Sequence, residues 1–182
     1  ALKLGVNFAR ANFPWDLRHV PPLLDALEIS GATVRLSPLN AKNVALRNVT
    51  VLGNPWTRAQ RTVHLERVVF GDRIDLSALA TVHDLSIDFV PQSTWISRVR
   101  KMRFLKGASG SLPPMANDVL EFDASGAHRL TLTGDLRVNE VRYFPSTAAV
   151  ANFHCYAATV VQLGAQAPRQ FFCETQHVTV YI

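Results

Sequence analysis

The sequence predicts a mainly β protein, built as a curved antiparallel sheet or a β-sandwich within a single domain of residues 1–182. Three observations predict this fold class. Apolar and polar residues alternate in many short segments, and glycine, proline and asparagine separate these segments. The composition, 48% apolar and 18% charged, lies far from that of disordered chains. A chain of this length buries roughly 70% of its unfolded surface, so it needs no disulfide or metal to fold.

The first two elements are expected to be a strand and a short helix. Leu4 and Val6 alternate with polar residues and glycine, which predicts a strand at the start of the chain. One short helix is expected near residues 16–27, where leucines and a valine recur at helical spacing and Asp16 is a candidate N-cap. Two prolines, at 21 and 22, limit the length of that helix.

Short strands follow one another from residue 27 to residue 91, with a brief turn or 3₁₀ piece before Leu79. The parity of the apolar residues switches between Leu46 and Val49, and again between Leu65 and Val68. A strand with such a switch must contain a bulge or change the face that it buries. The residues predicted to line an apolar, lipid-facing or partner-facing side of the sheet are Val44, Leu46, Val49, Val51, Val63, Leu65, Leu85, Ile87 and Phe89.

A basic, irregular connection is expected at residues 92–117, and it divides the chain into halves at 1–91 and 118–182. Its cationic side chains are candidates for contact with an anionic partner, in line with a net charge of +5. These residues are Arg98, Arg100, Lys101, Arg103 and Lys106. Lipid head groups and acidic protein surfaces suit them, nucleic acid less well, and a solvated face with no partner is the alternative.

The end of the chain is expected to be a hairpin of two strands, about residues 149–162 and 170–182, around a turn at 164–168. The two cysteines, Cys155 and Cys173, could form a disulfide or remain buried thiols, and direct opposition in a hairpin would need a turn centred on Gly164. Zinc binding with His154 and His177 is disfavoured, because residues four apart on a strand lie ~13 Å from each other. No metal or cofactor is predicted.

The sequence lacks the common enzyme motifs: neither type of glycine-rich phosphate loop, no Cys-x-x-Cys, no His-Glu-x-x-His and no Gly-x-Ser-x-Gly. The remaining candidates for acid–base pairs and nucleophiles are His64 with Glu66, His83 with Asp84, Ser109 and Ser111. Sequence alone supplies no geometry that joins them, and a histidine beside a carboxylate on a strand is usually an ordinary surface pair. We therefore expect a protein that is not an enzyme.

Four segments follow one another in residues 41–91: a strand ending at Gly53, a second strand over 63–68, the Asp-Leu-x-x-Leu turn of Asp75–Leu79, and a closing strand before Pro91. This order resembles the AsmA-like and TamB-like proteins of bacterial envelopes and their eukaryotic bridge-like relatives. The resemblance implies a curved sheet whose concave apolar face holds lipid acyl chains, without catalytic residues. This sequence shows neither the membrane anchor nor the many repeats of that family.

Two functions are consistent with these patterns. The first is a β domain that binds lipid, or lies against a membrane, through its apolar sheet face. The second is an accessory structural subunit of a larger, membrane-associated protein complex. The longest apolar runs have only four residues, so no transmembrane span is expected, and a bacterial envelope or a mitochondrion is the favoured location.

Overall fold

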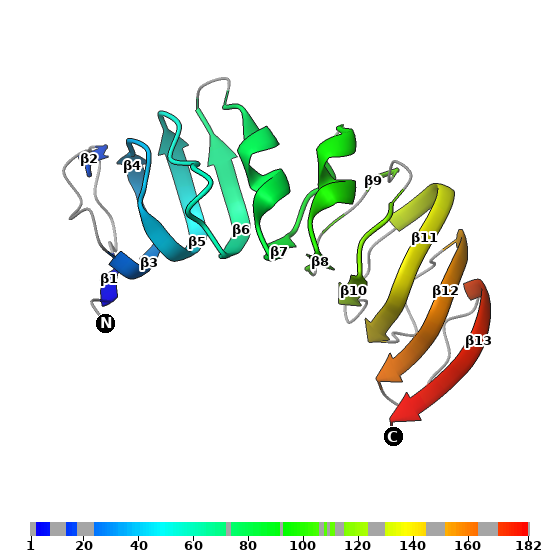
Figure 1. Ribbon diagram of the computed structural model, residues 1–182. Helices are drawn as coiled ribbons and strands as arrows, with labels where there is room; N and C mark the ends of the chain where they lie inside the picture. The colour runs from blue at the N-terminus through cyan, green and yellow to red at the C-terminus, as the bar shows by residue number, and fades with distance from the viewer. Residues whose placement is uncertain are drawn as a thin grey trace. The chain divides into compact units, whose positions relative to one another are not determined.

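The computed structural model is mainly strand, and every strand pair with an established register is parallel (Figure 1). The structure describes residues 3–7, 14–17, 24–71, 74–91, 93–105, 108, 110–111, 115–123, 130–144, 152–163 and 171–181. The chain forms two compact units, residues 1–85 and residues 86–182, which are called unit 1 and unit 2 below.

Unit 1 is an open parallel sheet. The strand segments 15–16, 33–35, 49–52 and 68–70 pair with one another along a second side of the unit, called here the second leg. Its elements are β1 (Lys3–Asn7), β2 (Trp15–Asp16), β3 (Leu24–Ser30), β4 (Thr33–Arg35), β5 (Ala41–Leu52), β6 (Thr62–Phe70) and the 3₁₀ helix η1 (Leu76–Thr81), and β7 (Asp84–Ile87) begins at its end. The main order is β1-β3-β5-β6, while β4 pairs with both β2 and β5. The expected first strand and the expected 3₁₀ piece are thus confirmed.

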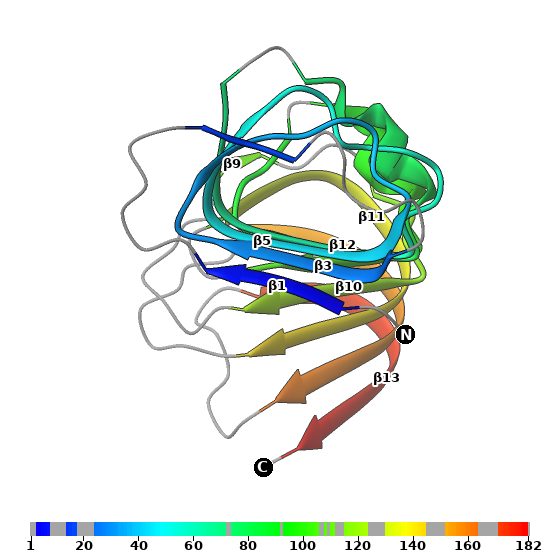
Figure 2. The ribbon, with the colours of Figure 1, turned by 90° about the vertical axis from the view of Figure 1, so that its left-hand side faces the viewer.

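The strands of unit 1 belong to successive coils that stack on one another (Figure 2). Side-chain hydrogen bonds between neighbouring coils join residues 18, 19 or 21 positions apart, which is the length of one coil. Stacking places like residues above like, and the two inner rows are Leu27–Val44–Val63 and Ile29–Leu46–Leu65. Their side chains are 0–2% exposed, so these rows form the core of the unit.

Each of these coils turns a corner at a residue with left-handed backbone geometry. Gly31, Asn48 and Arg67 have φ of 67°, 53° and 52°, and they occupy equivalent positions in three successive coils. Glycine and asparagine adopt this geometry readily, whereas an arginine there is uncommon. The register continues through these corners without a shift. The parity switches in β5 and β6 therefore mark a change of buried face, one of the two outcomes that the sequence predicts.

Two further positions fix the turns between coils. Gly53 has φ 81°, and a Cβ atom there would lie 2.4 Å from the carbonyl oxygen of Leu36, so only glycine fits. Gln60 is 3% exposed and bridges two coils: its Nε2 donates to the Leu39 carbonyl at 2.7 Å, while its Oε1 accepts from the Thr57 backbone N–H at 2.6 Å. These bonds satisfy polar groups that would otherwise be buried without partners.

Unit 2 repeats the parallel arrangement. Its elements are the 3₁₀ helix η2 (Thr94–Arg98) and strands β8 (Lys101–Phe104), β9 (Gly110–Ser111), β10 (Val119–Asp123), β11 (Leu130–Phe144), β12 (Asn152–Leu163) and β13 (Phe171–Tyr181). The order is β8-β10-β11-β12-β13, with β9 beside β11. Ile96, Met102, Phe104 and Leu120 have no exposed surface and form its described core.

The expectation of an antiparallel sheet or sandwich is wrong. Even the last two strands, expected to form a hairpin, run parallel, with Phe153 opposite Phe171 and Leu163 opposite Tyr181. Alternation shows which residues share a face but not the direction of the strand. Parallel neighbours need a long connection, and within unit 1 the corner, second leg and turn of each coil supply it.

The expectation of a short helix near residues 16–27 is also wrong for the residues that the structure describes. Trp15–Asp16 is a strand, β3 begins at Leu24, and residues 18–23 lie outside the described part. The spacing of three from Leu24 to Leu27 looked helical. The same spacing separates their register partners in β5, Ala41 and Val44, so it belongs to the strands of stacked coils.

The irregular basic connection expected at 92–117 contains regular structure. It includes η2, β8 and β9, and β8 buries Met102 and Phe104 completely. The cationic residues Lys101 and Arg103 alternate with these two, so the segment has the period of a half-buried strand. Its high charge obscured that period in the sequence.

Candidate interaction surface

The structure places the apolar residues of the expected lipid-facing set in the interior. Val44, Leu46, Val49, Val51, Val63, Leu65, Leu85 and Ile87 are 0–2% exposed, and Phe89 is partly buried. Apart from Phe89, their side chains present almost no surface to a ligand. Among the described residues, the large apolar side chains with substantial exposure are Trp15, at 44%, and Val69, at 60%.

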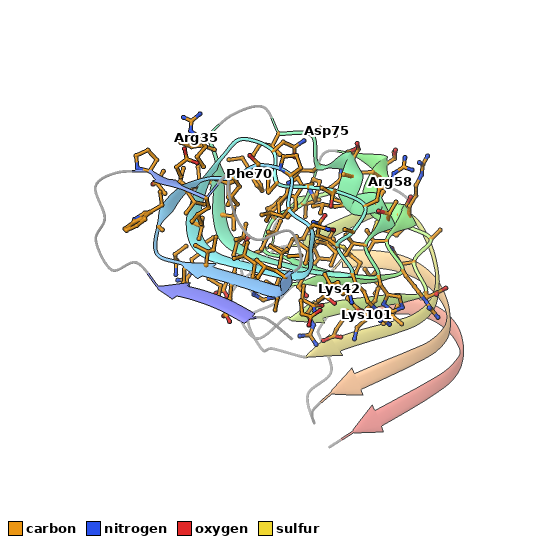
Figure 3. All side chains as sticks on the ribbon, turned by 60° about the vertical axis from the view of Figure 1, so that its left-hand side comes forward. Arg35, Lys42, Arg58, Phe70, Asp75 and Lys101 are labelled. Carbon is orange, nitrogen blue, oxygen red and sulfur yellow. The ribbon has the colours of Figure 1, made fainter. Side chains whose placement is uncertain are left out.

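The opposite side of the same strands carries a polar surface, called here the outer face. It consists of two rows in register, Glu28–Ala45–His64 and Ser30–Arg47–Glu66. Because these residues alternate with the inner rows, they point away from the core. Figure 3 shows the side chains of unit 1 on the ribbon, with Lys42 marking the start of β5.

Ion pairs run across the three strands of the outer face. Arg47 pairs with Glu28 on one side, and its Nε lies 3.7 Å from Oε2 of Glu66 on the other. Oε1 of Glu66 lies 3.2 Å from Nη2 of Arg67, and Oε2 of Glu66 lies 3.5 Å from Nε2 of His64. These side chains are between 25% and 66% exposed, so solvent and a partner can both reach them. The outer face therefore carries positive and negative side chains next to one another.

The basic residues expected to contact an anionic partner are largely paired within unit 2. Nε of Arg100 lies 2.8 Å from Oδ2 of Asp118, Nζ of Lys101 lies 3.7 Å from Oε2 of Glu121, and Arg103 pairs with the same glutamate. Arg98 is exposed at the end of η2, and Lys106 lies outside the described residues. The two carboxylates, Asp118 and Glu121, offset part of the positive charge of this segment.

Both histidine–carboxylate pairs noted in the sequence are in contact. Nδ1 of His83 lies 3.0 Å from Oδ2 of Asp84, and His64 approaches Glu66 on the outer face. Both members of the first pair are 38% exposed. Ser109 and the side chain of Ser111 lie outside the described part, and no described group of three or more His, Cys, Asp or Glu could hold a metal ion.

One carboxylate has a clear electrostatic role in the fold. The backbone N–H of Ser77 donates to Oδ1 of Asp75 at 2.8 Å, which caps η1. This bond, together with one from the Ser77 side chain, lowers the pKa of Asp75 below its ordinary value of 3.8. Asp75 stands on the solvent side of unit 1 (Figure 3).

Comparisons with protein-family models, with curated proteins and with solved structures found no match. The resemblance of residues 41–91 to AsmA-like and TamB-like proteins therefore stays a prediction. In the described part of the chain, no helix has the length and apolar character to cross a bilayer.

The outer face was missed at the sequence level, although a signal for it was present. Glu28, Arg47 and Glu66 are spaced by about one coil, as are Leu27, Val44 and Val63 beside them. A search for this repeat would have placed the three charges on the same face of neighbouring strands, in two adjacent rows.

Proposed function

We propose that this protein is a non-enzymatic scaffold subunit that binds another protein through the outer face of unit 1, within a larger and membrane-associated complex. The observation that carries this proposal is the burial of the apolar rows: the inner faces of β3, β5 and β6 are used to build the unit. The exposed polar face remains for recognition. The bacterial envelope or mitochondrial setting belongs to the proposal as well.

The chemistry of the outer face favours a protein partner with both charges. Glu28 and Glu66 offer acceptors for lysine or arginine, whereas Arg47 offers donors for a carboxylate. Ala45, whose side chain is a single methyl group, lies between Glu28 and His64 in one row of the face. Such an arrangement confers specificity by pairing opposite charges in a fixed pattern.

Lipid binding is a second candidate, and Val69 is the observation in its favour. This side chain is 60% exposed and stands on the second leg of its coil, in register with Thr50. A single exposed valine is common on soluble proteins, so the support is narrower than that for a protein partner.

Native mass spectrometry of the chain, isolated from its own source in mild detergent, separates the two candidates. Ala45→Arg places a long cation in the middle of the outer face, and Val69→Arg is the matched control on the second leg. We expect a protein partner at fixed stoichiometry that is lost with Ala45→Arg and retained with Val69→Arg. Thermal unfolding must show that both variants keep the wild-type fold.

Two results would contradict the proposal. Adducts of lipid mass on a monomer, lost with Val69→Arg and kept with Ala45→Arg, would establish the lipid function in its place. A protein partner that tolerates Ala45→Arg in a folded variant would show that recognition lies elsewhere on the chain.

A further inference from the structure

The only two cysteines of the chain occupy directly opposed positions in unit 2. Cys155 on β12 is the register partner of Cys173 on β13, and the parallel ladder continues for two pairs on one side and seven on the other. Register partners in a parallel ladder lie on the same face of the sheet. The sequence allows a disulfide between these cysteines but does not predict their direct opposition, because an antiparallel hairpin around residues 164–168 would bring them out of register.

The spacing of the strands suits a covalent link. Neighbouring strands lie about 4.7–4.9 Å apart, and disulfides join residues whose Cα atoms are roughly 4.4–6.8 Å apart. On the other side of Cys155, its register partner in β11 is Leu136, so each cysteine has the other as its only thiol neighbour in the ladder. No competing pairing within the chain exists.

We propose that Cys155 and Cys173 are a reversible thiol–disulfide pair that fastens β13 to β12. In the described part of unit 2, β13 has a single strand neighbour, and such a terminal strand is where local opening begins. A bond across the last pair of strands therefore acts where the sheet is easiest to open. This inference concerns unit 2 and does not depend on the proposed partner of unit 1.

The oxidation is a thiol–disulfide exchange with a small-molecule disulfide such as oxidised glutathione. The thiolate of one cysteine attacks that disulfide and releases one small-molecule thiolate, leaving a mixed disulfide on the protein. The second cysteine thiolate then attacks the protein sulfur and displaces the other small-molecule thiolate. The protein loses two electrons and two protons, and both appear in the two thiols released.

The test is to equilibrate the full chain in mixtures of oxidised and reduced glutathione, alkylate the free thiols and weigh the product. We expect the protein to pass from two alkyl groups to none as the mixture becomes oxidising, without a dimer or a persistent glutathione adduct. Incorporation of two alkyl groups in every mixture, or formation of intermolecular dimers, would overturn the proposal.

A shifted variant tests the register itself. Cys173→Ser combined with Glu174→Cys moves the second thiol by one position, to the opposite face of the sheet. In the folded state its intramolecular disulfide should be disfavoured by about tenfold or more relative to the natural pair, whereas in denaturant the two chains should behave alike. Equal formation in the folded state would overturn the proposal.

Amide hydrogen exchange measures whether the disulfide limits the local opening of β13. Oxidation should slow exchange of the β13 amides by roughly tenfold to a hundredfold. The disulfide closes the loop between Cys155 and Cys173 and so restricts the separation of β13 from β12. The Cys155→Ser variant should show the same exchange in both mixtures. Exchange in β13 that is unaffected by a formed disulfide would show that the bond does not fasten the strand.

Discussion

The β5–β6 region of unit 1 and the β8–β10 region of unit 2 have the same parallel arrangement of strands, but the glutamates in their ion pairs differ in exposure. Both bury alternate apolar residues, such as Leu46 and Met102, and both place a glutamate next to basic residues on neighbouring strands. Glu66 on the outer face is 32% exposed. Glu121 is only 2% exposed, between Lys101 and Arg103.

The difference in exposure separates two uses of an ion pair. An exposed pair contributes about 0–1 kcal/mol to stability, so the charges of the outer face are available for recognition at little cost to the fold. A buried carboxylate is expensive without a partner, so Glu121 depends on its two cations. Glu66 of unit 1 is thus exposed to solvent with its partners, whereas Glu121 of unit 2 is packed in the interior beside its two cations.

Large-to-small substitutions in the interior should lower the free energy of unfolding by a similar amount in the two regions. Leu46→Ala and Met102→Ala each remove a fully buried side chain, and each should lower the free energy of unfolding by about 2–5 kcal/mol. Urea titration followed by circular dichroism measures this change. Ala45→Ser, on the outer face, is the control and should stay within about 0.5 kcal/mol. A Leu46→Ala variant as stable as this control would show that the inner rows are not the core.

Loss of a cation should distinguish the two regions. Arg103→Ala leaves the buried carboxylate of Glu121 with Lys101 at 3.7 Å, and we expect a loss of roughly 1–3 kcal/mol. Arg67→Ala removes an exposed partner of Glu66 and should cost less than about 0.5 kcal/mol. Similar losses in the two variants would remove the contrast between presented and packed charges.

The coupling within the outer face should be small and sensitive to salt. A double-mutant cycle of Glu28→Ala and Arg47→Ala should give a coupling below about 1 kcal/mol, because both side chains are exposed. The coupling should fall further as sodium chloride is raised to about 1 M, where the Debye length is roughly 3 Å. A larger coupling that resists salt would mean that this pair stabilises the fold, as the Glu121 pairs do.

The smallest expected effect is the pH dependence of the two 3₁₀ helices. The pKa of Asp75 is lowered in the folded state, so its cap on η1 is complete above pH 3.8 and is lost as the pH falls through the lowered value. The N-cap of η2, Ser93, makes no side-chain cap bond and should show no such change. The amide resonance of Ser77 followed by NMR during acid titration reports this, with Asp75→Asn as the control. A Ser77 resonance that titrates equally in Asp75→Asn would assign the change to another group.

Much of the local structure could be predicted from particular residues. The alternation around Leu46 and Leu65 located the strands, and the residues around Leu79 located η1. The parity switches predicted a bulge or a change of buried face, and the structure has its corners at Asn48 and Arg67 in these places. The outer face could not be found in this way. Glu28, Arg47 and Glu66 are ordinary exposed charges in the sequence, and only the register brings them together.

The sequence by itself determined that the chain is mainly β and which residues of β5 and β6 lie on the buried side. Only the tertiary structure decided that the strands run parallel, that the apolar set forms an interior and that Cys155 and Cys173 are register partners in one ladder. The physical reason is that hydrophobic alternation is the same in both directions along a strand. Strand direction and register depend on how coils stack, through contacts between residues about one coil apart.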